Sequence, residues 1–147
     1  MHAPHYESFN KHVEKANQWL AELESDLDWS GYRHRTYVAL RAVLQALRDR
    51  LTTEETAHLG AQLPMILRGT YYENWKPSAR HKEERHLDAF LIRVGDELGD
   101  SYMGELEPVV RGVFRLLDHR VSDGEIEDIQ ALLPHELKEL WPSYVKV

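Results

Sequence analysis

The sequence contains no cysteine among its 147 residues. Disulfide bonds, thiolate metal sites and cysteine nucleophiles are therefore excluded, and the chain suits a reducing compartment. It also lacks any apolar run that approaches the roughly 18 residues of a membrane-spanning helix. The start, from Met1 to His5, has no apolar core of a signal peptide. We therefore expect a cytoplasmic protein with neither a leader nor a membrane span.

Basic side chains are fewer than acidic ones, 18 against 25, so the formal net charge is −7 at pH 7. This balance argues against general nucleic-acid binding. The charge is uneven: residues 1–75 carry a net of −2, residues 76–86 a net of +2, and residues 87–147 a net of −7. A basic connector thus joins a nearly neutral half to an acidic half. It is either ordinary surface charge or a segment that packs on the acidic half or meets an acidic ligand.

What the chain does contain is an internal repeat. Residues 41–71 align with residues 111–141 at a constant offset of 70, and 9 of the 31 aligned positions are identical. Repetition at this scale indicates two copies of one supersecondary unit. Residues that both copies keep are expected to serve the fold, and residues found in one copy are freer to serve function.

The spacing of apolar residues is helical throughout, and no segment shows the alternation of a β-strand. The first helix carries a stripe stepping by three and four positions, made of Tyr6, Phe9, Val13, Ala16, Leu20 and Leu23. The second helix carries another, from Tyr37 to Leu51. The second copy repeats these with Leu87 to Leu98 and Leu106 to Val121. Its first helix is expected to begin near Glu84.

Capping boxes mark the third helix of each copy. Thr52 and Glu55 have the spacing at which each side chain bonds the backbone amide of the other, and Ser122 and Glu125 repeat this spacing. The occurrence of the motif in both copies makes the assignment safer.

Prolines end these short third helices. Pro64 and Pro134 lack the amide that a continuing helix needs, yet each can begin a fourth helix. The expected fourth helices are Met65 to Tyr72 and His135 to Trp141. The sequence therefore predicts an all-α fold of two tandem four-helix repeats, residues 1–75 and 87–147, joined by the connector 76–86 and packed into one compact helical domain.

No catalytic or cofactor pattern is present. There is no nucleophile elbow, phosphate loop or dinucleotide fingerprint. Glu55 and Glu125 are assigned to the capping boxes, and no carboxylate pair is expected in an apolar surround. The nine histidines lack the order of a zincin. We expect no enzyme, no cofactor and no bound metal.

The segment from Arg68 to Trp75 is the candidate binding surface. It contains Tyr71 and Tyr72 with Trp75, and tyrosine, tryptophan and arginine dominate binding hot spots. Its other interpretation is an aromatic plug that seals the end of the repeat. His81, in the connector, is included in the candidate surface.

These blocks resemble a known family. Ala39-Leu40-Arg41-Ala42-Val43-Leu44, Gly60-Ala61-Gln62-Leu63-Pro64-Met65 and Tyr71-Tyr72-Glu73-Asn74-Trp75 are similar to the bacterial domain-of-unknown-function family 2267. Val121-Ser122-Asp123-Gly124-Glu125 with Leu133-Pro134 and Leu140-Trp141 extends the likeness, which runs from Phe9 to Trp141. The resemblance implies an all-helical tandem repeat and carries over no catalytic residue.

The leading functional hypothesis is a non-enzymatic protein–protein interaction or self-association module, for example a homodimer, with no nucleic-acid or membrane partner. The alternative is a small-ligand or metal-binding protein with a pocket between the two repeats. Arg68, Tyr72 and His81 would be candidate lining residues of that pocket. A contiguous exposed apolar patch favours the first hypothesis, and a closed pocket with convergent polar groups favours the second.

Overall fold

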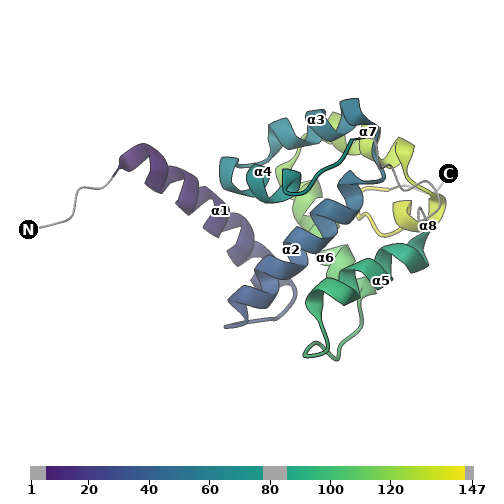
Figure 1. Cartoon of the computed structure of the whole chain (residues 1–147), viewed down its shortest axis with the longest axis horizontal. Helices are drawn as coiled ribbons and strands as arrows, with labels where there is room; N and C mark the ends of the chain where they lie inside the picture. Colours follow the sequence, from purple (N-terminus) through teal and green to yellow (C-terminus); the bar gives the residue numbers. More distant parts are fainter. Residues whose placement is uncertain (1–5, 78–85, 145–147) are drawn as a thin grey trace, which may run out of the picture.

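Helices account for all the regular structure in the part of the chain described by the computed structural model, residues 6–77 and 86–144. The prediction of an all-α fold is thereby confirmed. The helices, shown in Figure 1, are α1 (Glu7–Asp26), α2 (Arg33–Arg48), α3 (Thr53–Gln62), α4 (Met65–Tyr72), α5 (Leu87–Leu98), α6 (Glu107–Arg120), α7 (Asp123–Leu132) and α8 (His135–Lys138).

The two predicted caps begin α3 and α7. The hydroxyl of Thr52 accepts the amide of Glu55 at 3.1 Å, and the hydroxyl of Ser122 accepts the amide of Glu125 at 3.3 Å. The predicted reciprocal bond, from the amide of the capping residue to the glutamate carboxyl, forms in neither box. The amide of Ser122 instead donates to Oε1 of Gln62, at the end of α3, at 2.9 Å. Gln62 thus ties the end of α3 to the start of α7 and leaves the Glu125 carboxyl free of a capping role.

Pro64 and Pro134 stand directly before α4 and α8, as predicted. Helix α4 has the expected bounds, whereas the prediction that α8 reaches Trp141 is wrong. Leu140 and Trp141 continue in tight turns bonded to the carbonyls three residues earlier. Pro142 follows and disfavours helical angles at Trp141, so a regular helix does not resume after these turns.

The predicted connector falls mostly outside the described residues. Only Lys76 and Pro77 at its start and His86 at its end are described. His86 has extended backbone angles and precedes α5, which begins at Leu87. The predicted start of that helix at Glu84, and His81 of the candidate surface, also lie outside the described residues.

The two halves of the chain pack on each other across most of their helices. Helix α2 contacts α5 and α6, α1 contacts α6, and α3 contacts α7. Figure 1 shows α3 and α7 side by side, with α2 and α6 running through the middle of the molecule. Buried residues of both halves form one hydrophobic core, so the chain makes a single helical body.

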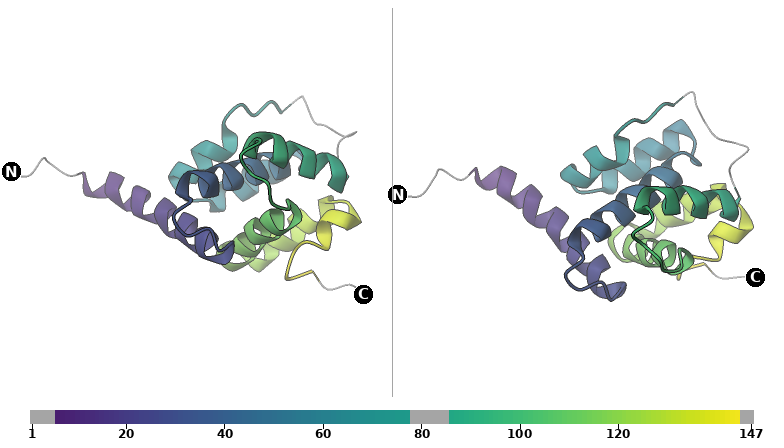
Figure 2. Two further views of the ribbon diagram at one scale, coloured as in Figure 1. Left: turned by 90° about the horizontal axis from the view of Figure 1, so that it is seen from below. Right: turned by 60° about the horizontal axis from the view of Figure 1, so that its bottom comes forward.

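The first half of α1 departs from this body. In every view of Figures 1 and 2 the amino-terminal turns of α1 project away from the other helices. Its later residues are buried at Ala16, Trp19 and Leu23. Within residues 6–77 and 86–144, no helix combines the length and apolar character needed to cross a bilayer.

Candidate functional site

The predicted aromatic surface is largely buried. Tyr71 has no exposed area, and its hydroxyl donates to the carbonyl of Thr56 in α3 at 2.9 Å. Burial raises the pKa of this phenol above its ordinary value. Because Tyr71 lies wholly in the core, its assignment to a binding surface is wrong. The periodicity of α4, which places Leu67 and Tyr71 on one face, is the reason.

Tyr72 and Trp75 are half-buried against the end of the first repeat. The Tyr72 ring contacts those of Tyr71 and Trp75, with centroids 5.0 and 5.4 Å apart. It also lies over Gly60, where an added Cβ would come within 3 Å of the ring. Glycine at position 60 therefore admits the tyrosine, and binding through the remaining exposed surface of Tyr72 and Trp75 stays a prediction.

Arg68 caps the end of α3. Its guanidinium donates to the carbonyl of Gly60 at 2.8 Å and to that of Leu63 at 3.0 Å. These carbonyls belong to the last turn, where a helix leaves acceptors without partners. The contacts explain the presence of arginine at this position without a ligand.

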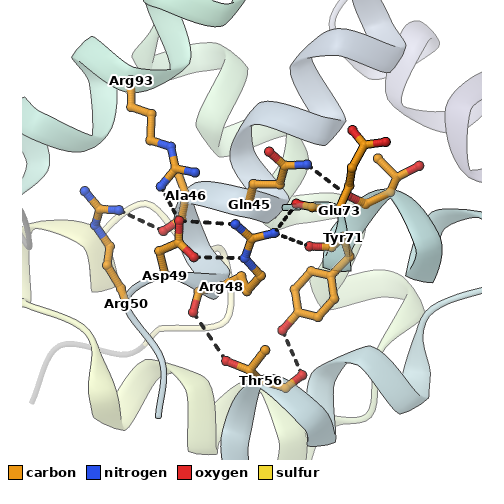
Figure 3. A network of polar contacts seen from close by, with 10 residues as sticks. Gln45, Ala46, Arg48, Asp49, Arg50, Thr56, Tyr71, Glu73 and Arg93 are labelled. Atoms are coloured by element: carbon orange, nitrogen blue, oxygen red, sulfur yellow. Dashed lines mark hydrogen bonds and ion pairs between the residues drawn. The ribbon is translucent and has the colours of Figure 1, made fainter. Parts of the chain in front are cut away.

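A buried arginine holds the other end of the aromatic segment, Arg68 to Trp75. Arg48, at the end of α2, is 3% exposed. Its Nη1 atom donates to the carbonyls of Tyr71 and Glu73 at 2.6 and 2.9 Å, and its Nε atom donates to Asp49 at 2.9 Å. Figure 3 shows the guanidinium between these partners. The network fixes the end of α4 on α2.

Asp49 connects this network to the second half of the chain. Its carboxylate accepts a hydrogen bond from Arg93 of α5 at 2.6 Å. Burial acts to raise the pKa of Asp49, but hydrogen bonds from Arg48 and Arg93 outweigh it and hold the pKa below its ordinary value. The carboxylate is therefore ionised at neutral pH and pairs both arginines.

The second half of the chain closes its aromatic end with different chemistry. Position 118 corresponds to position 48 at the offset of 70, and Asp118 accepts the amide of Ser143 at 2.9 Å and its hydroxyl at 2.7 Å. Trp141, the counterpart of Tyr71, is buried and stacks on Phe114 with centroids 4.0 Å apart. Anchoring at equivalent positions supports the plug interpretation for both halves.

The described clefts do not coincide with the expected pocket between repeats. A cleft of about 340 Å³ lies between α1 and α2, within the first half. It is lined by Asn17, Leu20, Ala21, Glu24, Arg33 and Thr36. A hollow of about 20 Å³ beside Trp75 has room for a water molecule at most. Neither is lined by Arg68 or Tyr72.

An exposed apolar stripe lies on the projecting turns of α1. We define the α1 stripe as Tyr6, which directly precedes the helix, with Phe9 and Val13; Tyr6 is 76% and Phe9 is 61% exposed, whereas Val13 is half-buried. It continues the buried face that begins at Ala16. The same sequence pattern therefore serves the core at one end of α1 and remains uncovered at the other.

A group of three ligating side chains is also brought together, which the sequence analysis missed. Atoms of Glu55, His58 and Glu125 lie within 4.8 Å of one another where α3 meets α7. Burial, together with the neighbouring Glu55, raises the pKa of Glu125 to about 8. The signal available in the sequence is the same glutamate in both capping boxes, Glu55 and Glu125.

Comparison with known families finds a match over most of the chain. Residues 16–140 match the family model described as "Uncharacterized conserved protein (DUF2267)". The chain belongs to this family. The resemblance noted from the repeated blocks is thus confirmed. The DUF2267 description assigns no activity, and no protein of curated function matches the chain.

Proposed function

We propose that this DUF2267 protein is a non-enzymatic interaction module that self-associates through the α1 stripe. The observation that carries the proposal is the exposure of Tyr6 and Phe9 on turns that project from the body. Isolated apolar side chains on a surface are normal, but a contiguous apolar face rimmed by polar residues is typical of an interaction site. The aromatic segment, by contrast, is mostly used in internal packing.

The flanks of the stripe suit a second copy of the same helix. The residues beside it include Asn10, His12 and Asn17, none of which is a carboxylate or a lysine. Two α1 helices could therefore approach each other without like-charge repulsion along the seam. A twofold arrangement buries the same patch of both chains, so each apolar contact between the helices occurs twice in the dimer.

The contribution of Phe9 to dimer affinity follows from the apolar surface that the dimer would bury. Covering one phenylalanine side chain contributes about 1.5–3 kcal/mol, and a twofold dimer covers Phe9 of both chains. A charged residue at this position should therefore weaken association by about 100-fold or more.

Sedimentation velocity over a range of concentrations tests this with Phe9→Glu. The matched control is Ile92→Glu, because Ile92 on α5 is 63% exposed, close to the 61% of Phe9. We expect the wild type and the Ile92 variant to form dimers and the Phe9 variant to remain monomeric. A wild type that stays monomeric at about 100 μM, a concentration at which even weak dimers form, or a Phe9 variant that associates normally would refute self-association through α1.

A further inference from the structure

Two buried carboxyl groups face each other at the contact between α3 and α7. Glu125 is 7% exposed, and its Oε2 atom has no hydrogen-bond partner. The Oε1 atom of Glu55 is likewise buried without a partner. Burying an unpaired carboxylate is strongly unfavourable, and two together repel each other. The site therefore calls for a positively charged occupant.

The fold itself turns these side chains inward. The hydroxyls of Thr52 and Ser122 fix the first turns of α3 and α7, with a glutamate at the third position of each. In the second cap, Gln62 takes the amide that the glutamate of a complete capping box would take. The carboxyl of Glu125 consequently lies against α3.

A third ligand comes from the next turn of α3. His58 follows Glu55 by three positions, which places both side chains on one face of the helix. Its Nδ1 atom lies 3.5 Å from Oε2 of Glu55. At the equivalent position of α7, Asp128 follows Glu125 by the same spacing, and its negative charge contributes to the raised pKa of Glu125. Helix α3 thus supplies a Glu-x-x-His pair to the cluster, and α7 supplies Glu125.

We propose that Glu55, His58 and Glu125 bind one divalent transition-metal ion at the junction of α3 and α7. Carboxylate oxygen and imidazole nitrogen are both zinc ligands. A mixed nitrogen and oxygen set favours transition metals over calcium and magnesium, which prefer oxygen alone. A doubly charged ion neutralises the two carboxylates and links the two halves of the chain. This site is separate from the α1 stripe.

The geometry needs only a modest contraction. Ligand atoms around a tetrahedral zinc ion at about 2.1 Å lie about 3.4 Å apart. The three ligand atoms lie within 4.8 Å of one another, so the most distant pair must close by up to about 1.4 Å. His58 can supply this movement because its side chain is 52% exposed. A water molecule would complete the coordination.

A shared proton is the competing occupant. A carboxyl pair can relieve its repulsion when one member stays protonated. The raised pKa of Glu125 is compatible with that alternative as well as with a metal site. The two differ in one respect: a shared proton has no need of His58, whereas a metal ion does.

The test is zinc binding to the chelator-treated full-length protein, measured by calorimetry and by thermal denaturation. The variants are His58→Gln and Glu125→Gln, and the matched control is His135→Gln. The side chain of His135 is 56% exposed, close to the 52% of His58, and pairs with Glu139 just after α8 at 2.8 Å. Wild type and control should bind zinc at this site and gain thermal stability. Both site variants should lose more than tenfold in affinity, since even loss of a supporting residue costs about 10–100-fold.

The same variants also show whether a loss of zinc binding comes from a loss of folding. Without metal, Glu125→Gln should be at least as stable as the wild type, because the neutral amide, unlike the carboxyl group, can be buried without first taking up a proton. Far-ultraviolet circular dichroism checks that its helices are retained. Zinc that fails to stabilise the wild type, or that binds the His58 variant as tightly as the control, would overturn the metal site. In either case a protonated carboxyl pair would explain the cluster.

Discussion

Replacement of Arg48 by methionine should destabilise the protein by about 3–5 kcal/mol, the range found when one partner of a buried ion pair is removed. Methionine keeps the apolar stem and removes the guanidinium. The change deletes hydrogen bonds to the carbonyls of Tyr71 and Glu73, and bonds to a charged group contribute about 1.5–3 kcal/mol each. Removing the cost of burying the guanidinium offsets part of this loss.

Urea denaturation, followed by circular dichroism, measures this loss. The control is Arg111→Met, because Arg111 forms an exposed pair with Glu107 one turn away in α6. Such pairs contribute about 0.3–0.5 kcal/mol. A loss below about 1 kcal/mol for Arg48→Met, comparable to an exposed pair, would refute the view that this network holds α4 in place.

The same network predicts a dependence on acid. The pKa of Asp49 is lowered in the folded protein, so its contribution to stability is present above the ordinary pKa of 3.8 and is lost as the pH falls through the lowered value. Arg48→Met removes one of the two arginines responsible. The variant should therefore show a weaker loss of stability in acid than the wild type.

Two further predictions concern α3 and α7. Thr52→Ala and Ser122→Ala should each cost about 1 kcal/mol in urea denaturation, and no loss would mean that these caps are replaceable by water. With chelator present, the raised pKa of Glu125 should make stability fall as the pH rises from 4.5 through about 8, because the folded state holds a proton that the unfolded state has released. Glu125→Gln should remove this slope, and a slope that persists in the variant would assign it to other groups.

Local chemistry accounts for the features that sequence reasoning predicted well. The step of three and four residues identified the helices, and a hydroxyl three residues before a glutamate identified both caps. Pro64 fixed the start of α4 because a missing amide acts on its immediate neighbours. Each of these signals depends on a few consecutive residues and needs no knowledge of the rest of the chain.

Long-range contacts account for the features that it missed. Tyr71 and Trp75 are both aromatic residues of the same short segment, yet Tyr71 is wholly buried and Trp75 is half-buried. The amide of Ser122 donates its hydrogen bond to Gln62, 60 residues away, in place of Glu125. No local pattern distinguishes a carboxylate that caps its own helix from one that faces a second carboxylate.

The sequence by itself determined the helices, their caps and stops and the resemblance to the DUF2267 family, since these follow from covalent neighbours and periodicity. Only the tertiary structure decided which apolar faces are covered. It left Phe9 exposed while burying Leu23 of the same stripe. It also brought Glu55 and Glu125 together, because the packing of α3 on α7 is set by the whole core and by contacts between residues far apart in the chain, such as Gln62 with Ser122.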